Sequence, residues 1–218
     1  MKTFLSIGTG PGIGIATAER FSKAGFRTLL CSRDPARLEA HATGLRALGQ
    51  ACETMRVDAA DATDVQALIS KVLELHGSID VLHYNAASLR QSTLEEQPAA
   101  TFAADLCVNI AGAMVAIQAV STSMFARSEG TLLLTGGRFG LAPVPEYIAL
   151  SVGKAGIRAL ALGLFESFKS KGVHVAIVNV AATVEPASEL SLDVADEFWK
   201  VYNAPRDEWI CEVTYPGI

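Results

Sequence analysis

Short apolar runs alternate along the chain with longer segments in which apolar residues recur at helical spacing. This alternation is typical of βαβ units, in which helices connect parallel strands. The apolar runs predict strands near residues 3–7, 27–31, 52–57, 80–84, 131–135, 173–180 and 209–214. The amphipathic segments predict helices near residues 12–24, 35–48, 63–76, 98–125, 145–170 and 187–202. We therefore expect residues 1–218 to form a single α/β domain, with helices on both faces of a doubly wound parallel sheet.

The composition supports a globular domain and argues against several classes of partner. Of the 218 residues, 50% are hydrophobic and 19% are charged, which is ample for a large buried core. The net charge of −5 and the lack of a basic run argue against nucleic acid or an anionic membrane as a partner. No apolar run reaches the length of a membrane span, and Met1–Ile7 leads into a glycine loop without room for a signal peptide. We therefore expect a cytoplasmic protein, and the four scattered cysteines predict no metal site.

A glycine-rich loop joins the first predicted strand to the first predicted helix. The candidate ligand-binding residues in it are Gly8, Gly10, Gly12, Ile13 and Gly14. A loop that leaves a strand and enters a helix presents backbone N–H groups and the positive end of the helix to an anion. Glycines allow the tight turn and the close approach of a pyrophosphate. A plain tight turn is the alternative, but the strand before and the helix after favour a dinucleotide-binding site.

The end of the second predicted strand bears on the choice of cofactor. NAD-binding proteins usually carry an acidic residue there, which bonds the 2′-hydroxyl of the ribose, whereas a 2′-phosphate requires a cation. This chain has Ser32 and Arg33 at that point. A hydroxyl and a guanidinium suit a phosphate, so the pair favours NADP(H). In the alternative interpretation, Arg33 is a solvated loop residue and Asp34 only caps the next helix.

Further segments complete a family pattern. Val57-Asp58 follows the third predicted strand, Tyr84-Asn85-Ala86-Ala87 follows the fourth, and Asn109 and Lys154 fall in the two long predicted helices. With the glycine loop, these segments resemble the short-chain dehydrogenase/reductase family from residue 3 to about residue 180. The resemblance implies a Rossmann fold with the strand order 3-2-1-4-5-6-7.

The resemblance also implies roles for single residues. Asp58 would bond the adenine, and Asn85 and Ala86 would belong to the segment that the family writes N-N-A-G. Asn109 would position a water molecule in the proton relay. Lys154 would bind the hydroxyls of the nicotinamide ribose and take part in catalysis.

The chain departs from the family at the reacting centre. The family's catalytic tyrosine lies four residues before the lysine, and that position is Leu150; the family's serine lies thirteen residues earlier still, at Gly137. The Pro-Gly pair after the sixth strand becomes Val180-Ala181, and the following threonine becomes Glu185. The region expected to form a substrate lid, residues 181–208, is short. The resemblance therefore implies a degenerate catalytic tetrad.

Two residues at strand ends are candidates for a replacement group. Tyr84 could donate a proton, and Arg138 could bind an anionic group or polarise a carbonyl, because both are expected at the crevice where ligands of open α/β sheets bind. The alternatives are that Tyr84 packs in the core and that Arg138 is solvated. Tyr147 and Ser151 are weaker candidates: Tyr147 lies about 10 Å from Lys154 along a helix, and a serine is a poor acid without a base. His83 is expected to pack beside the fourth strand.

Two classes of function remain open. One is an NADP-dependent oxidoreductase that acts on a small molecule with altered acid–base machinery. The other is a non-catalytic dinucleotide-binding protein, either a cofactor sensor or the structural partner of an active relative. The segments 98–125 and 145–170 are apolar around most of their circumference, and in relatives these helices pair across a two-fold axis, so we expect a homodimer or homotetramer.

Overall fold

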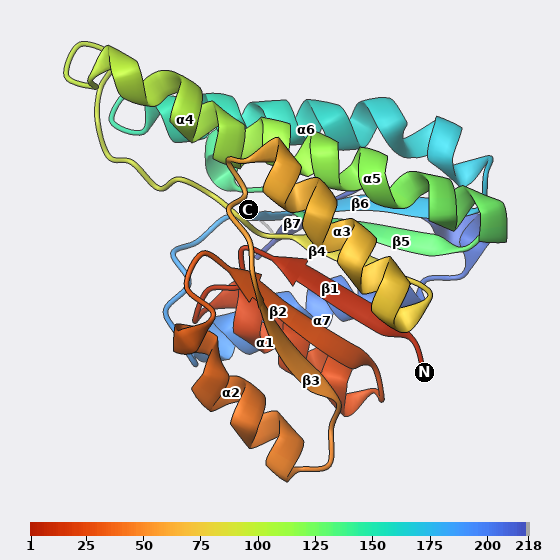
Figure 1. Ribbon diagram of the computed structural model, residues 1–218. Helices are drawn as coiled ribbons and strands as arrows, with labels where there is room; N and C mark the ends of the chain where they lie inside the picture. Colours follow the sequence, from red (N-terminus) through yellow and green to blue (C-terminus); the bar gives the residue numbers. More distant parts are fainter. Residues whose placement is uncertain (217–218) are drawn as a thin grey trace.

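The computed structural model describes residues 1–216 and is built on a seven-stranded sheet in the order β3-β2-β1-β4-β5-β6-β7 (Figure 1). All six neighbouring pairs of strands are parallel. The expected strand order is confirmed. Successive strands are added toward one edge of the sheet from β1 to β3 and toward the opposite edge from β4 to β7, so the switch point lies between β1 and β4. The strands are β1 (Thr3–Ile7), β2 (Arg27–Ser32), β3 (Cys52–Arg56), β4 (Val81–Tyr84), β5 (Gly130–Thr135), β6 (Val173–Val180) and β7 (Glu212–Tyr215).

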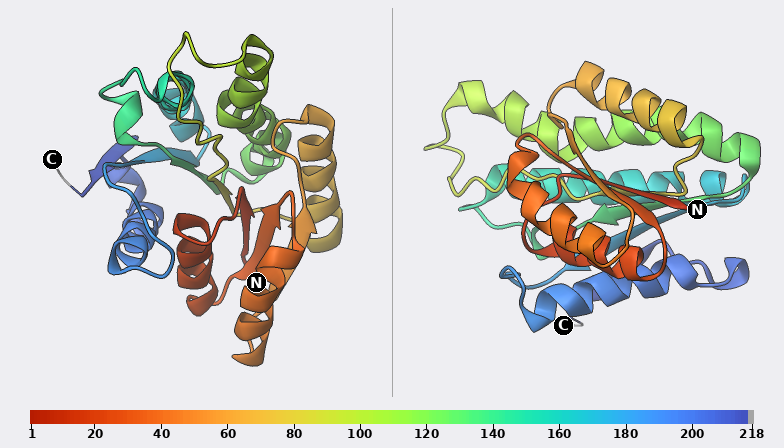
Figure 2. Two further views of the ribbon diagram at one scale, coloured as in Figure 1. Left: turned by 90° about the vertical axis from the view of Figure 1, so that its left-hand side faces the viewer. Right: turned by 60° about the horizontal axis from the view of Figure 1, so that its bottom comes forward.

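Helices cover both faces of the sheet, as Figure 2 shows. One face carries α3 (Ala62–His76), α4 (Phe102–Leu106), α5 (Gly112–Arg127) and α6 (Ile148–Lys169). The other face carries α1 (Ile13–Lys23), α2 (Ala36–Ala47) and α7 (Glu189–Asn203). Short 3₁₀ turns lie at Ala99–Thr101, Arg138–Gly140 and Arg206–Glu208.

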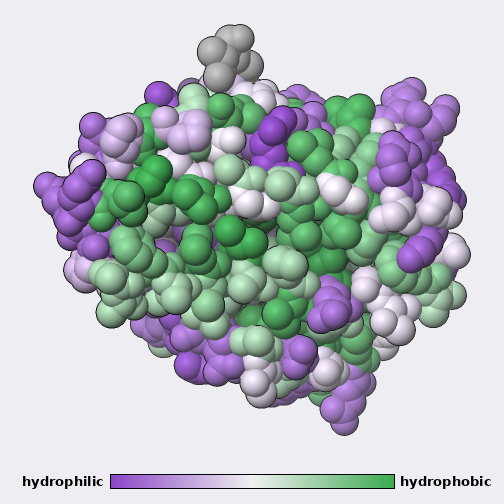
Figure 3. Space-filling view, turned by 90° about the horizontal axis from the view of Figure 1, so that it is seen from above, coloured by the Kyte–Doolittle hydropathy of each residue, from purple (hydrophilic) through white to green (hydrophobic). Residues whose placement is uncertain are grey.

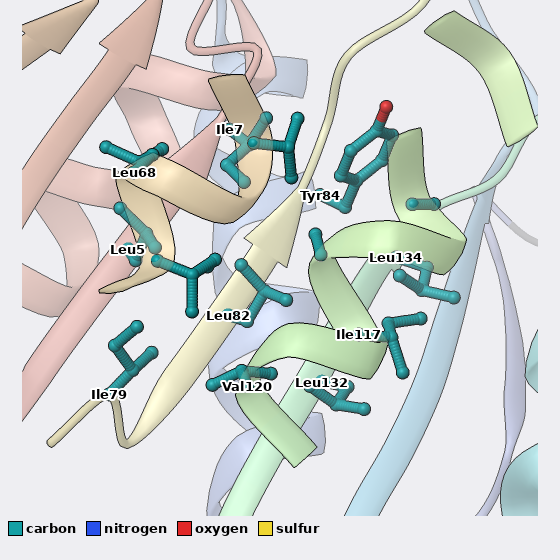
Figure 4. Packing of buried hydrophobic residues seen from close by; sticks show 14 of the residues in the cluster. Leu5, Ile7, Leu68, Ile79, Leu82, Tyr84, Ile117, Val120, Leu132 and Leu134 are labelled. Carbon is teal, nitrogen blue, oxygen red and sulfur yellow. The ribbon is translucent and has the colours of Figure 1, made fainter. Parts of the chain in front are cut away.

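Each face of the sheet has its own apolar core, because successive side chains of a strand point to opposite sides. Leu5, Leu82 and Leu134 belong to the cluster that α3, α5 and α6 cover, and Figure 4 shows them beside Leu68 of α3 and beside Ile117 and Val120 of α5. Phe4 and Leu133 point the other way, toward the helices α1, α2 and α7. The two cores hold the strands in place, and the loops that leave the carboxyl ends of β1 to β5 form the site described below.

The long helix predicted over residues 98–125 is interrupted. A π-helical turn, Cys107–Ala111, separates α4 from α5, and α5 continues to Arg127. Single π turns inside α-helices are frequent at functional sites. By length and composition alone, Ala99–Arg127 and Ile148–Lys169 could each cross a membrane, but in this fold both lie against the sheet, where Ala116 and Ala161 are buried.

The expected substrate lid, residues 181–208, needs correction. Most of it is α7, which packs against α1 with Val194 and Phe198 buried in the core. This helix therefore belongs to the covering layer of the sheet. The segment 181–188 approaches the glycine loop, where the carbonyl oxygen of Val184 lies 3.4 Å from the place that a Cβ on Gly12 would take.

Candidate functional site

A cleft of about 920 Å³ runs along the carboxyl ends of β1, β2, β3 and β4 and is closed on one side by α4. Crevices at this edge of an open α/β sheet, where the strand order reverses, are the usual ligand sites of the architecture. Of the residues predicted to bind a cofactor, those that line the cleft are Gly8, Gly10, Ser32, Arg33, Asp58, Asn85 and Ala86. Gly12, Ile13, Gly14 and Lys154 are not among its lining residues. The three residues 12–14 form the start of α1, and Lys154 lies in α6.

The glycine loop is tight for reasons of packing and conformation. Gly8 has a φ of +81°, and a Cβ there would overlap Ala86. A Cβ on Gly14 would lie 2.9 Å from the Cα of Thr9. The side chain of Asn85 donates a hydrogen bond to the carbonyl oxygen of Gly8 at 2.8 Å, which ties the loop after β4 to the loop after β1.

Gly10 differs from these glycines, because a Cβ on it would meet nothing within 4 Å. Its backbone faces open space in the cleft. The N-cap of α1, Gly12, provides no side-chain hydrogen bond to the first turn of the helix. The backbone N–H groups at this helix end can therefore bind an anion, as the sequence predicts.

Basic side chains gather at the end of the cleft that β2 forms. Arg33 is exposed and Ser32 half-buried, and Arg37 and His41 of α2 line the same cleft. Asp34 does not cap α2: its carboxylate lies 3.0 Å from Nε of Arg37. The amphipathic pattern identifies α2 but does not show that one face of its first two turns lines the cleft.

Lys154 lies in α6 beside the end of β5. Its Nζ donates a hydrogen bond to the carbonyl oxygen of Thr135 at 2.7 Å, and burial lowers the pKa of the amine to about 8. A Cβ on Gly137 would lie 3.6–3.7 Å from the aliphatic part of this lysine. Leu150 is buried. The positions that carry the serine and tyrosine in the family therefore supply no hydroxyl group near Lys154.

Asn109 lies in the π-helical turn and is buried. Its Oδ1 accepts a hydrogen bond from the backbone N–H of Ser88 at 2.7 Å. A Cβ on Gly153 would overlap the side chain of Asn109, so the π turn packs directly against α6 at the residue before Lys154. The structure thus brings Asn109 and Lys154 together at one place.

The two candidate replacement groups have different surroundings. Tyr84 is fully buried, and its hydroxyl donates a hydrogen bond to the carbonyl oxygen of Val108 at 2.6 Å, so it packs in the core and does not point into the crevice (Figure 4). Burial raises the pKa of this phenol. Arg138 is exposed in a 3₁₀ turn, with its guanidinium 5.7 Å from the ring centre of Phe139, and it is not among the residues that line the cleft. For Tyr84 the expectation of a side chain in the crevice is wrong, and the alternative, packing in the core, holds. The exposure of Arg138 agrees with the solvated alternative, and its role in binding or catalysis stays a prediction.

A buried histidine, His83 of β4, is linked to Lys154 through Thr135. His83 is within hydrogen-bonding distance of the hydroxyls of Ser6, at 3.3 Å, and Thr135, at 3.0 Å. Burial, and then the nearby charge of Lys154, lower the pKa of His83 to about 3. The ring is therefore neutral at physiological pH, and Thr135 contacts both residues, His83 through its hydroxyl and Lys154 through its carbonyl.

The parallel sheet and the glycine-lined cleft at its switch point define a dinucleotide-binding α/β protein. The family model described as short chain dehydrogenase matches residues 2–191. The chain therefore belongs to the short-chain dehydrogenase family.

Individual relatives agree with this assignment. An uncharacterized oxidoreductase of Staphylococcus saprophyticus is 29% identical over 188 residues, which are 86% of this chain and 80% of the relative. Galactitol 2-dehydrogenase of Agrobacterium fabrum is 26% identical over 212 residues, 95% of this chain and 76% of that enzyme. A metagenomic short-chain oxidoreductase in complex with NADP is similar in structure, with a TM-score of 0.89, 25% identity, and coverage of 98% of this chain and 95% of that one. The short-chain dehydrogenase from Rhodopseudomonas palustris, at 22% identity and a TM-score of 0.91, has the same fold over 100% of this chain and 99% of its own.

Proposed function

We propose that the protein binds NADP(H) in the cleft and is an oxidoreductase with a degenerate catalytic tetrad. The observation that carries the choice of cofactor is the pair Ser32 and Arg33, which lines the cleft at the end of β2. A guanidinium and a hydroxyl are suited to a 2′-phosphate. The NADP complex of the similar metagenomic oxidoreductase supports this choice.

The residues of the cleft fit such a cofactor. Gly10 leaves open space where the backbone meets the cleft, and the uncapped start of α1 favours a pyrophosphate. Asp58 and Ala86 line the cleft on either side of that loop and would contact the adenosine half. The cofactor would supply the hydride. The protein would bind the cofactor, orient the substrate against it and provide or remove one proton.

Proton management is where this chain differs from its family. Lys154 would hold ribose hydroxyls, and Asn109 fixes the π turn beside it. Neither Leu150 nor Gly137 can donate a proton or a hydrogen bond through its side chain. The loss of a positioned general acid typically lowers a rate by about 10² to 10⁴. We therefore expect weak or absent turnover of ordinary ketones and alcohols, and the substrate is a small molecule of unassigned class.

The second candidate function is a non-catalytic dinucleotide-binding protein, either a sensor or the structural partner of an active relative. The specific observation in its favour is the absence of a proton donor at positions 137 and 150 beside a lysine that is kept. Calorimetric titration with NADPH and NADH, combined with an NADPH-dependent assay of diketone reduction, separates the two functions. Tight NADPH binding with turnover supports the oxidoreductase, binding without turnover supports the sensor, and equal affinity for NADPH and NADH contradicts the proposed cofactor.

The assembly and location are also proposals. Figure 3 shows an extended apolar surface over the α4–α6 side of the molecule. In the most apolar windows of Ala99–Arg127 and Ile148–Lys169, only 33% of the residues are buried. Met114, Val152 and Leu162 are 51%, 48% and 43% exposed there. We propose a homodimer or homotetramer that covers this surface, in the cytoplasm, with no nucleic-acid or membrane partner.

A further inference from the structure

The loop after β4 places a guanidinium on the wall of the cleft. Arg90 lines the cleft together with Asp105, which belongs to α4. Nε of Arg90 donates to one carboxylate oxygen of Asp105 at 2.7 Å, and Nη2 lies 3.4 Å from the other. The side chain of Asp105 is 5% exposed and that of Arg90 is 36% exposed. The carboxylate therefore lies behind the guanidinium, which faces the cleft.

The position of this carboxylate is fixed by further donors. Asp105 also accepts hydrogen bonds from the hydroxyl of Ser88 at 2.6 Å and from Nε2 of Gln97 at 2.9 Å. The guanidinium of Arg90, and then the Ser88 hydroxyl, lower the pKa of Asp105, so the carboxyl group stays charged. A buried carboxylate with this many partners has little freedom, and it holds the guanidinium in one orientation.

The geometry decides which chemistry the guanidinium can offer. Hydrogen bonds from Nε and Nη2 to a carboxylate lie in the plane of the guanidinium, so they use its edge and leave its flat faces free. Flat guanidinium faces stack on aromatic rings and on nucleic-acid bases. Because Asp105 neutralises the charge of Arg90, the pair offers little net attraction to a phosphate, whereas stacking needs only the flat face.

Small and apolar residues line the same cleft as the pair. The loop after β3 contributes the small residues Ala59 and Ala60 to the same cleft, and Val108 of the π turn adds an apolar contact. The phosphate-binding features, Gly10 and the start of α1, belong to a different loop. This part of the cleft thus has the character of a base-binding pocket.

We propose that Arg90, held in place by Asp105, is the platform on which the purine base of the bound dinucleotide stacks. This proposal rests on the proposed function, since it requires a dinucleotide in the cleft. It assigns base recognition to two residues that belong to no motif of the sequence analysis.

The test uses 2′,5′-ADP, the adenosine half of the proposed cofactor, and needs no catalysis. Arg90→Ala alone would leave a buried carboxylate without its partner and could unfold the protein. The variant Arg90→Ala/Asp105→Leu removes both charges and leaves the net charge unchanged. Calorimetric titration should show about tenfold weaker binding of 2′,5′-ADP than in the native protein, the effect expected for the loss of one stacked base. Because Asp105→Leu also leaves Ser88 and Gln97 without their acceptor, thermal unfolding should show a lower but still cooperative transition, which confirms that the variant is folded at the temperature of the titration.

A second variant separates stacking from charge. Arg90→Lys keeps the cation and its ion pair with Asp105 but has no flat face, so it should also bind 2′,5′-ADP more weakly. Native affinity in Arg90→Lys, or in the double variant, would overturn the proposal while leaving the cofactor site intact. The control Lys2→Ala/Glu129→Ala removes an exposed ion pair outside the cleft and should bind like the native protein. No binding of 2′,5′-ADP by the native protein would overturn the cofactor site and this proposal together.

Discussion

The residue that decides between the two nicotinamide cofactors is Arg33. Arg33 is exposed and lines the cleft at the end of β2, where a guanidinium would be available to a 2′-phosphate. A charged hydrogen bond to a phosphate contributes about 1.5–3 kcal/mol, which corresponds to at least a tenfold change in affinity. In calorimetric titrations we expect NADPH to bind at least tenfold more tightly than NADH, and Arg33→Ala to remove most of that difference. Arg206→Ala, an exposed arginine in another part of the molecule, should leave it unchanged.

The residues that decide activity are Gly137 and Leu150. A serine fits at 137, since an added Cβ would be in ordinary contact with the stem of Lys154. The missing hydrogen bond to a developing oxyanion is often worth about 2.7–4 kcal/mol. We therefore expect Gly137→Ser/Leu150→Tyr to raise NADPH-dependent reduction of a diketone clearly above the native rate. The matched control is Gly137→Ser/Leu150→Phe, which adds nearly the same bulk without the phenol and should stay near background. Equal gains in the two variants would show that the phenol is not what the site lacks.

His83 gives the protein a specific sensitivity to acid. Its pKa in the folded state is about 3, below the unfolded value near 6.5, so between these values the unfolded chain binds more protons. The free energy of unfolding should therefore fall as the pH drops through this window. The contribution of His83 is about 3 kcal/mol between pH 7 and pH 4. His83→Gln keeps a polar group near Ser6 and Thr135 but does not titrate. Urea unfolding at both pH values should show a smaller loss in this variant, and an identical loss would mean that other groups cause the acid sensitivity.

Single residues also show where sequence reasoning reached its limit. The glycines of the first loop, Arg33 and Asn85 could be located, because their roles depend on local backbone geometry next to a strand end. Tyr84 also ends a strand, but strand alternation turns its side chain under α5, where the space left by Gly112 admits the hydroxyl. The side of the sheet to which a strand-end side chain points depends on how the strand is placed among its neighbours. The sequence near Tyr84 does not give that placement. The pair of Arg90 and Asp105 was missed because it forms between an irregular loop and a helix.

At the scale of elements, α6 contacts the π turn through glycine. A Cβ on Gly153 would overlap Asn109, whereas one on Gly163, two to three turns along the same helix, would meet nothing within 4 Å. Gly153→Ala should therefore destabilise the protein by about 1–3 kcal/mol through overpacking. Gly163→Ala, its matched control, should stabilise it by about 0.5–1 kcal/mol, because alanine favours the helix. Urea unfolding measures both changes, and two changes of the same sign would contradict the contact between α6 and the π turn.

The elements themselves were largely predictable, and the exceptions have physical causes. Strands and helices followed from apolar runs and helical spacing, because burial on a sheet face imposes those periods. The π turn within the long helix was not predictable, since one extra residue in a turn leaves the apolar pattern almost unchanged. The predicted lid was wrong because α7 has the apolar stripe of a helix that covers a sheet, and the pattern does not say which surface that stripe meets.

At the scale of the whole molecule, the apolar surface over α5 and α6 predicts how copies of the chain assemble. In a single chain, Met114, Val152 and Leu162 are exposed to water. Contiguous apolar surfaces of this kind usually mark an interface. Light scattering at micromolar concentration should give a particle of two or four chains, since a single chain has a mass of 23.0 kDa. Val152→Glu/Leu162→Glu places two carboxylates in the proposed interface, where charged residues are depleted, and should shift the particle toward the single chain. Leu48→Glu, a change at another exposed leucine beyond the end of α2, should not. A stable single chain in the native protein would refute the assembly, and it would leave the cleft and its cofactor unaffected, because every residue assigned to them belongs to one chain.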